Sequence, residues 1–224
     1  MIKKLLVIFI LISTAVSSCS LISRKPKTSD VNAFAITCIN DKITPSGNPH
    51  SESDSYCKKY YYPMVDERGI EFDVVAENRK VMFIEAYIPF LYNKSLYYTT
   101  NYKKCVLAYY ADEIKDILNE AGISDYEYYK DSIRLTIPAD YPLEKAAATV
   151  ITLDDLLDYN LKTNAYSQQS LGSNQFWNWF DRDDIIVKQM NSNNEQILFE
   201  SFQFSDNNNN ELTYDSLLEA LSRE

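Results

Sequence analysis

Short apolar runs recur along most of the chain, and their composition indicates strands. Each run is rich in Val, Ile, Phe or Tyr, the residues that pleated sheets favour. The alternation is clearest at Ile133, Leu135 and Ile137, where every second side chain is apolar and Pro138 then ends the run. The connections between runs are short, which favours antiparallel pairing. Strands are predicted at residues 31–39, 70–75, 81–90, 95–102, 106–110, 132–137, 184–190 and 196–204.

A helical period replaces this alternation in residues 111–121. Ile114, Ile117 and Leu118 lie on one face of a helix, and acidic residues occupy its first turn. Gly122 follows as the C-terminal stop, because glycine adopts the left-handed conformation that ends many helices. The segment is therefore predicted to be an amphipathic helix.

Two segments far apart in the chain begin in the same way. Residues 151–157 and 212–218 each place a Thr, Thr152 and Thr213, before acidic or hydroxyl groups and a Leu pair. This is the pattern of a helix N-cap and first turn, which explains the likeness better than a duplication does. The turn-rich residues 40–55 are predicted to be an exposed loop. The whole pattern predicts an α+β fold, a mostly antiparallel sheet with helices packed on one face, and does not support parallel βαβ order.

The first 18 residues have the order of a secretory signal. Lys3 and Lys4 precede an apolar run over residues 5–12, and small residues then lead to Cys19. The apolar run is too short for a transmembrane helix, which needs about 20 apolar residues. Residues 1–18 are therefore predicted to be a signal peptide that is removed from the mature protein.

The sequence VSSC at residues 16–19 resembles the lipobox of bacterial lipoproteins. The resemblance implies that Cys19 is acylated, becomes the mature N-terminus and anchors the protein to a membrane through its acyl chains. By the same resemblance, Ser20 implies transfer to the outer membrane, where the protein faces the periplasm. Residues 19–30 are predicted to be a disordered, lipidated tether, and residues 31–224 a single α+β domain.

Composition narrows the class of function. The chain has 224 residues, a formal net charge of -10 and 46% hydrophobic residues, which indicates a folded acidic protein. Basic runs longer than two residues do not occur beyond position 27, so a nucleic-acid partner is not expected. The four glycines are too far apart to form a phosphate-binding loop, and no cofactor is predicted.

The four cysteines divide between anchoring and cross-linking. With Cys19 acylated, Cys38, Cys57 and Cys105 remain in an oxidising compartment, and three pairings are possible. A disulfide between Cys38 and Cys57 is favoured, because closing the polar loop between them stabilises the fold by about 3 kcal/mol. Cys105 is then free, and we expect it to be buried on a strand. A reactive thiol at Cys105 is the alternative, but Lys103 is expected to point to solvent instead of activating it.

Groups with catalytic chemistry are few. His50 is the single histidine, so a two-histidine zinc site is excluded, no metal site is predicted, and a hydrolase triad would depend on this loop residue. An aromatic segment that contains Trp177 and Trp179 is followed by three acids, and glycosidases need two carboxylates beside a sugar-binding surface. The preferred interpretation is that the tryptophans fill the core and the acids form a solvated turn. The acids are Asp181, Asp183 and Asp184.

Tyrosine is unusually frequent, with 18 residues in the chain. So many phenols are difficult to bury with satisfied hydroxyl groups, and exposed Tyr is typical of protein interfaces. The candidate binding surface therefore comprises Tyr60, Tyr61 and Tyr62 together with Trp177 and Trp179. Amino-acid usage in a lineage rich in Tyr and Asn explains the count equally well. Further groups of tyrosines occur at residues 97–98, 109–110 and 126–129.

The signal, the scarcity of catalytic groups and the acidic, Tyr-rich body favour a binding protein. We expect a lipid-anchored cell-envelope protein that binds a protein partner in the envelope and is not an enzyme. An immunity protein or inhibitor is one form of this hypothesis, because small acidic lipoproteins that neutralise envelope-targeting toxins are similar in size and location. An accessory subunit of an envelope assembly is another. The alternative is a carboxylate-dependent cell-wall glycan hydrolase.

Overall fold

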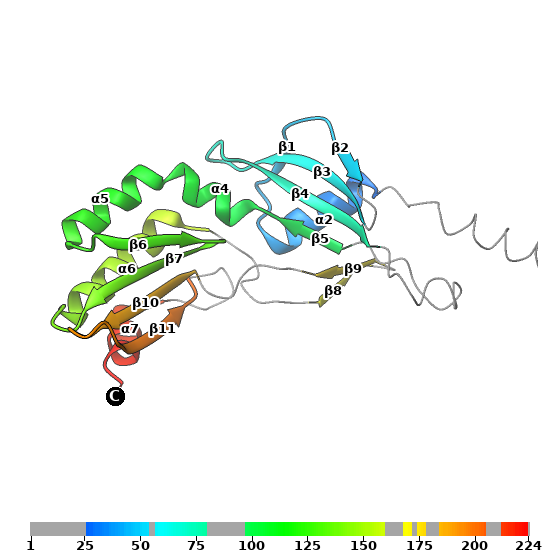
Figure 1. The fold of residues 1–224 in the computed structure, drawn as a ribbon. Helices are drawn as coiled ribbons and strands as arrows, with labels where there is room; N and C mark the ends of the chain where they lie inside the picture. Colours follow the sequence, from blue (N-terminus) through cyan, green and yellow to red (C-terminus); the bar gives the residue numbers. More distant parts are fainter. Residues whose placement is uncertain are drawn as a thin grey trace, which may run out of the picture.

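The computed structural model places two sheets beside each other, each with helices packed against one of its faces (Figure 1). Helix α4 lies where the chain passes from the first sheet to the second. The structure describes residues 26–53, 57–79, 97–159, 168–171, 174–177, 184–204 and 212–223.

The first sheet is antiparallel throughout. Its strands are β1 (Thr44–Pro45), β2 (His50–Ser53), β3 (Cys57–Val65), β4 (Glu71–Arg79) and β5 (Tyr97–Thr100). They pair in the order β1-β3-β4-β5, and β2 also pairs with β3. Helix α2 (Thr28–Cys38) packs against this sheet, where the Phe34 ring stacks on Tyr98 with 5.7 Å between ring centroids.

The second sheet contains β6 (Asp125–Tyr129), β7 (Ser132–Pro138), β10 (Ile185–Met190) and β11 (Gln196–Phe202). They pair in the order β11-β10-β7-β6. Three helices cover one face, with α6 (Leu143–Leu157) between α5 (Ala111–Ala121) and α7 (Tyr214–Leu221) (Figure 1). A short hairpin of β8 (Gln168–Leu171) and β9 (Asn174–Trp177) completes the described strands.

The α+β class with mostly antiparallel strands is confirmed, with one local exception. Strand β10 pairs with β7 in parallel, with Ile185 opposite Ile133, and helix α6 lies between the two strands in the chain. The expectation that parallel βαβ order is absent is therefore wrong at this place. A crossover helix of this kind buries its apolar side on the sheet, and α6 does so through Val150, Leu153 and Leu157.

Residues 31–38 lie in helix α2 and Ile39 is its C-cap, so the strand predicted at 31–39 is wrong. The buried residues Val31, Phe34 and Ala35 have the three- and four-residue spacing of a helix face, which the apolar composition of the run concealed. The helix begins at Thr28, and Tyr62 donates a hydrogen bond of 3.0 Å to the carbonyl of the buried Pro26. Residues 26–30, which were predicted to belong to a disordered tether, are therefore part of the folded structure.

Residues 102–109 form helix α4, so the strand predicted at 106–110 is also wrong. Strand β5 ends at Thr100, two residues before the predicted end of the strand at 95–102. Buried side chains at Tyr102, Lys103, Val106 and Leu107 form one face of this helix. The strand predicted at 81–90 lies outside the described residues. Residues 40–55 carry the short strands β1 and β2, whose side chains are exposed.

Two local predictions are confirmed, and a third is wrong. Helix α5 ends at Gly122, which adopts the left-handed conformation with φ 72°. Thr213 caps helix α7 by accepting a hydrogen bond from the Ser216 N–H at 3.2 Å. Thr152, by contrast, lies inside α6, and its hydroxyl donates to the carbonyl of Ala148. Its prediction as an N-cap is wrong, because α6 starts nine residues earlier at Leu143.

Candidate functional site

The structure buries two members of the predicted binding surface. Tyr60 and Tyr62 are only 5% and 3% exposed, because they lie on the β3 face that packs with α2. Tyr61 points to the opposite face, where its ring stacks on His50 at 4.8 Å between centroids. The expectation that Tyr60 and Tyr62 are exposed is therefore wrong. The side chain of Trp177 and the whole of Trp179 lie outside the described residues.

Exposed tyrosines gather elsewhere, around the junction of α4 with α5 and the β6–β7 hairpin. Tyr109, Tyr128 and Tyr129 are 55%, 44% and 42% exposed. Tyr109 contacts the ring of Tyr110 edge to face, with 4.9 Å between centroids. The Tyr129 ring lies under the guanidinium of Arg134 at 3.4 Å, on the sheet face opposite to Tyr128. Exposed phenols are thus present, as the tyrosine count predicted, but not at residues 60–62.

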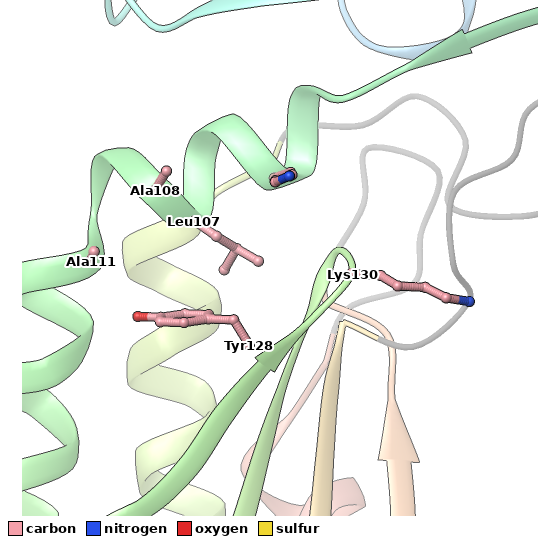
Figure 2. Close-up of a pocket in the computed structure, with 6 residues that line it drawn as sticks. Leu107, Ala108, Ala111, Tyr128 and Lys130 are labelled. Carbon is pink, nitrogen blue, oxygen red and sulfur yellow. The ribbon is translucent and has the colours of Figure 1, made fainter.

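A groove opens beside Tyr128, between helix α4 and strand β6, and has a volume of about 380 Å³. Figure 2 shows Leu107 and Tyr128 approaching each other from the two walls, with Ala108 and Ala111 along the helical wall. We call this cavity the α4–β6 groove. Its lining residues are Lys104, Leu107, Ala108, Ala111, Tyr128 and Lys130.

The sequence builds this groove through two local features. Helix α4 ends and α5 begins at Tyr110, whose dihedral angles of φ -98° and ψ 20° bend the chain. The small side chains of Ala108 and Ala111 then leave space that larger residues would fill. On the other wall, alternation along β6 directs Tyr126 and Tyr128 to the same face, where their rings meet edge to face at 6.0 Å.

The polar groups of the groove are cationic or neutral. Lys104 and Lys130 contribute to its lining, although the chain as a whole carries a formal net charge of -10. The Lys130 side chain points away from Leu107 and Tyr128 (Figure 2), and its Nζ lies 5.3 Å from the centre of the Tyr129 ring, so its charge lies outside the groove. Burial raises the pKa of Tyr128, and the neighbouring Tyr126 and Asp112 raise it further. The phenol therefore stays protonated and remains a hydrogen-bond donor at neutral pH. The groove thus combines apolar walls with the positive charge of Lys104 and the hydroxyl group of Tyr128.

A second polar cluster is fully enclosed. Lys103 Nζ lies 2.6 Å from Asp184 Oδ1, and the two side chains are 1% and 0% exposed. The Phe204 N–H donates to Asp184 Oδ2 at 2.9 Å, and Lys103 Nζ lies 5.6 Å from the centre of the Tyr159 ring. Burial raises the pKa of Asp184, whereas the charge of Lys103 lowers it. We call Lys103, Asp184, Tyr159 and the Phe204 N–H the buried pair cluster.

This cluster corrects two predictions from sequence. Lys103 does not point to solvent, because residue 103 lies on the buried face of a helix and not on a strand. Asp184 does not belong to a solvated acidic turn and, being enclosed, cannot contact a glycan. Asp181 and Asp183 lie outside the described residues. The helical spacing of the apolar residues at 102–107 could have indicated that Lys103 lies on a buried helix face. Nothing in the local sequence indicates that Lys103 pairs with Asp184.

A third polar network ties the first sheet to α4 and α6. Arg68 Nε contacts Asp66 Oδ2 at 2.9 Å, and Arg68 also donates to the hydroxyl of Tyr102 and to the carbonyl of Leu157, both at 2.8 Å. Burial raises the pKa of Tyr102, so its hydroxyl stays protonated and donates to Asp66 at 3.1 Å. The network satisfies its polar groups internally, which is what a structural role requires.

Cys105 is free, as predicted, but it lies on helix α4 and is half-buried. Burial raises the pKa of its thiol, and the charge of Asp73 acts in the same direction. The charge of Lys104 lowers the pKa but does not outweigh these effects, so the alternative of an activated thiol is not supported at this position. The side chains of Cys38 and Cys57 lie outside the described residues, and their disulfide stays a prediction.

Within the described ranges, no three His, Cys, Asp or Glu side chains come together in a way that would hold a metal ion. The described helices are all too short or too polar to cross a bilayer. Comparisons of the chain with protein-family models, with curated proteins and with solved structures found no match.

Proposed function

We propose that this protein is a lipid-anchored cell-envelope protein that binds a protein partner through the α4–β6 groove. The groove is the observation that carries the proposal. It joins apolar walls at Leu107 and Tyr128 to positive charge at Lys104. The lipobox-like sequence at residues 16–19 supports the location, since acyl chains anchor a protein without a spanning helix.

The chemistry of the groove indicates what the partner presents. A volume of about 380 Å³ is at the small end of the range for binding pockets, which suits one or two anchor side chains of a protein. The apolar walls favour an aliphatic or aromatic anchor side chain. Lys104 favours a carboxylate beside that anchor, and the hydroxyl of Tyr128 can donate to a carbonyl.

Two roles fit this proposal. An immunity protein or inhibitor would occupy a toxin through the groove, and an accessory subunit would dock on an envelope assembly. Neighbouring genes distinguish them, because a toxin-like neighbour supports inhibition and envelope-assembly genes support the accessory role. Asp184 contributes nothing to the alternative of a glycan hydrolase, since it is enclosed and paired with Lys103.

Capture from the host envelope tests the proposal. The full-length, lipidated protein is extracted in detergent with its stoichiometric partner, and the affinity is then measured with purified components. Tyr128→Ala removes the aromatic wall and is expected to weaken binding by about 1–4 kcal/mol, as truncation of an interface hot spot does. Lys104→Glu reverses a charge on the rim and is expected to slow association and to reduce its salt dependence.

Tyr214→Ala is the matched control. Tyr214 is also an exposed tyrosine, but it lies on α7 and does not line the groove. We expect this variant to bind like the unmodified protein. A partner that binds Tyr128→Ala and Lys104→Glu as tightly as the unmodified chain would remove the groove from the proposal.

A further inference from the structure

The buried pair cluster brings an amine and a carboxyl group into contact where water is excluded. Lys103 Nζ and Asp184 Oδ1 are 2.6 Å apart, and both side chains are enclosed. Burying two opposite charges costs free energy that their attraction repays only in part. A reaction that removes both charges is therefore favoured at this place more than in water.

We infer that Lys103 and Asp184 form an isopeptide bond, an amide between Lys103 Nζ and Asp184 Cγ, which cross-links helix α4 to the start of strand β10. The bond is an autocatalytic modification that follows folding, and it needs no oxidant or external co-reactant. It does not depend on the proposed binding function. Proximity supplies the main driving factor, because groups held in contact react as if at effective concentrations of about 10⁵–10⁸ M.

The surroundings of Asp184 suit the formation of an amide. The Phe204 N–H donates to Oδ2 at 2.9 Å, so it stabilises the negative charge that this oxygen gains when Cγ becomes tetrahedral. The Tyr159 ring lies beside Lys103 Nζ and shields it from water. A further buried carboxyl group, Asp154 on α6, is close enough for its charge to raise the pKa of Asp184.

The reaction balances as a condensation. A proton moves from the Lys103 ammonium to Asp184 Oδ1, which gives a neutral amine and a carboxylic acid. The Nζ lone pair attacks Cγ, a C–N bond forms, and the carbonyl electron pair moves to Oδ2. Asp154 takes a proton from nitrogen and returns it to the Oδ1 hydroxyl. The C–O bond then breaks, water leaves, and the carbonyl re-forms; ammonium and carboxylate have become an amide and one water molecule.

Peptide mapping of the full-length protein, reduced and denatured, tests the bond. Trypsin does not cleave after an acylated lysine, so the bond predicts a branched peptide in which residues 95–104 are joined to residues 183–188. Its mass is the sum of the two peptides less one water molecule. Recovery of the linear peptides 95–103 and 183–188 in full yield would overturn the inference. The comparison uses the unmodified protein and needs no variant.

Variants separate the bond from the fold. Asp184→Ala removes the electrophile and is expected to give linear peptides only. Asp154→Asn removes the proton carrier and is expected to slow bond formation by roughly 100-fold, the scale of general acid–base catalysis. Asp155→Asn is its matched control, because Asp155 is the exposed neighbour of Asp154 on the same helix. Equal rates of bond formation after refolding of the two Asn variants would contradict the role given to Asp154.

Discussion

At the scale of single residues, helix α4 shows how the position of a side chain around a helix determines its surroundings. Lys103 and Lys104 are adjacent in the chain, yet Lys103 is enclosed beside Asp184 and Lys104 lines an open groove. Successive residues on a helix are about 100° apart, so neighbours face different surroundings. Cys105, the next residue along the helix, is half-buried.

The thiol of Cys105 is expected to react slowly in the native protein. Its pKa is raised, so at pH 8 a smaller fraction is thiolate than in a free cysteine, and burial also restricts access. Alkylation by iodoacetamide at pH 8, followed by mass spectrometry, should therefore be slower than for an unstructured cysteine peptide. In denaturant the two rates should become equal. A native rate as high as that of the peptide would show that Cys105 is more exposed and more acidic than the structure indicates.

The same labelling examines the predicted disulfide. Without reductant, denatured protein should accept one label, at Cys105, because Cys19 is predicted to be acylated and Cys38 to be linked to Cys57. With reductant the number of labels should rise to three. Labelling of Cys38 and Cys57 before reduction would contradict the disulfide.

At the scale of elements, one helix start was predicted correctly and a similar one was not. Thr213 and Thr152 precede similar sequences, but Thr213 forms a capping box with Ser216 and Thr152 lies inside α6. The difference arises upstream. Residues 143–150 continue the helical face of α6 through Ala146, Ala147 and Val150, and propensity favours extending a helix once it has begun.

Alanine at these two threonines should affect stability differently. Thr213→Ala is expected to lower the free energy of unfolding by about 1 kcal/mol, because the N-terminal N–H groups of α7 lose their acceptor. Thr152→Ala is expected to leave it unchanged or raise it slightly, since Ala is the better helix former at an exposed interior site. Urea denaturation followed by circular dichroism measures both values. A larger loss for Thr152→Ala would mean that α6 begins near residue 152 after all.

At the scale of the whole molecule, α4 and the segments that it contacts join two sheets into one core. Arg68 in the β3–β4 turn binds Tyr102 on α4 and the carbonyl of Leu157 on α6. Lys103 on the same helix reaches Asp184 at the start of β10. The buried apolar residues of the two sheets accordingly form a single cluster. The exposed groove lies at this junction, beside α4.

Membrane attachment is expected to depend on one residue. Cys19→Ala should release the protein from membranes and abolish labelling with radioactive palmitate, because the acyl chains provide the predicted anchor. Fractionation of cells that express the full-length chain measures the first effect. Ser20→Ala, which keeps the cysteine, serves as a control and should stay membrane-bound. Continued sedimentation of Cys19→Ala with membranes would contradict the lipoprotein prediction.

The sequence alone determined those features in which local pattern and burial agree. Residues 111–121 have one apolar face, an acidic first turn and a terminal glycine, so every local preference favours the helix that forms. The alternation of Ile133, Leu135 and Ile137 similarly determined β7, because a strand with one buried face has a single permissible register. The α+β class followed from such segments.

Tertiary structure alone decided which residues meet. Apolar runs such as 31–39 and 106–110 are compatible with both a helix and a strand, and only packing against the sheets selects the helix. The contact of Lys103 with Asp184 and the α4–β6 groove join segments far apart in the chain, for which local sequence carries no signal. Burial in a shared core is a property of the folded molecule. The buried pair and the groove could therefore be identified only from the tertiary structure.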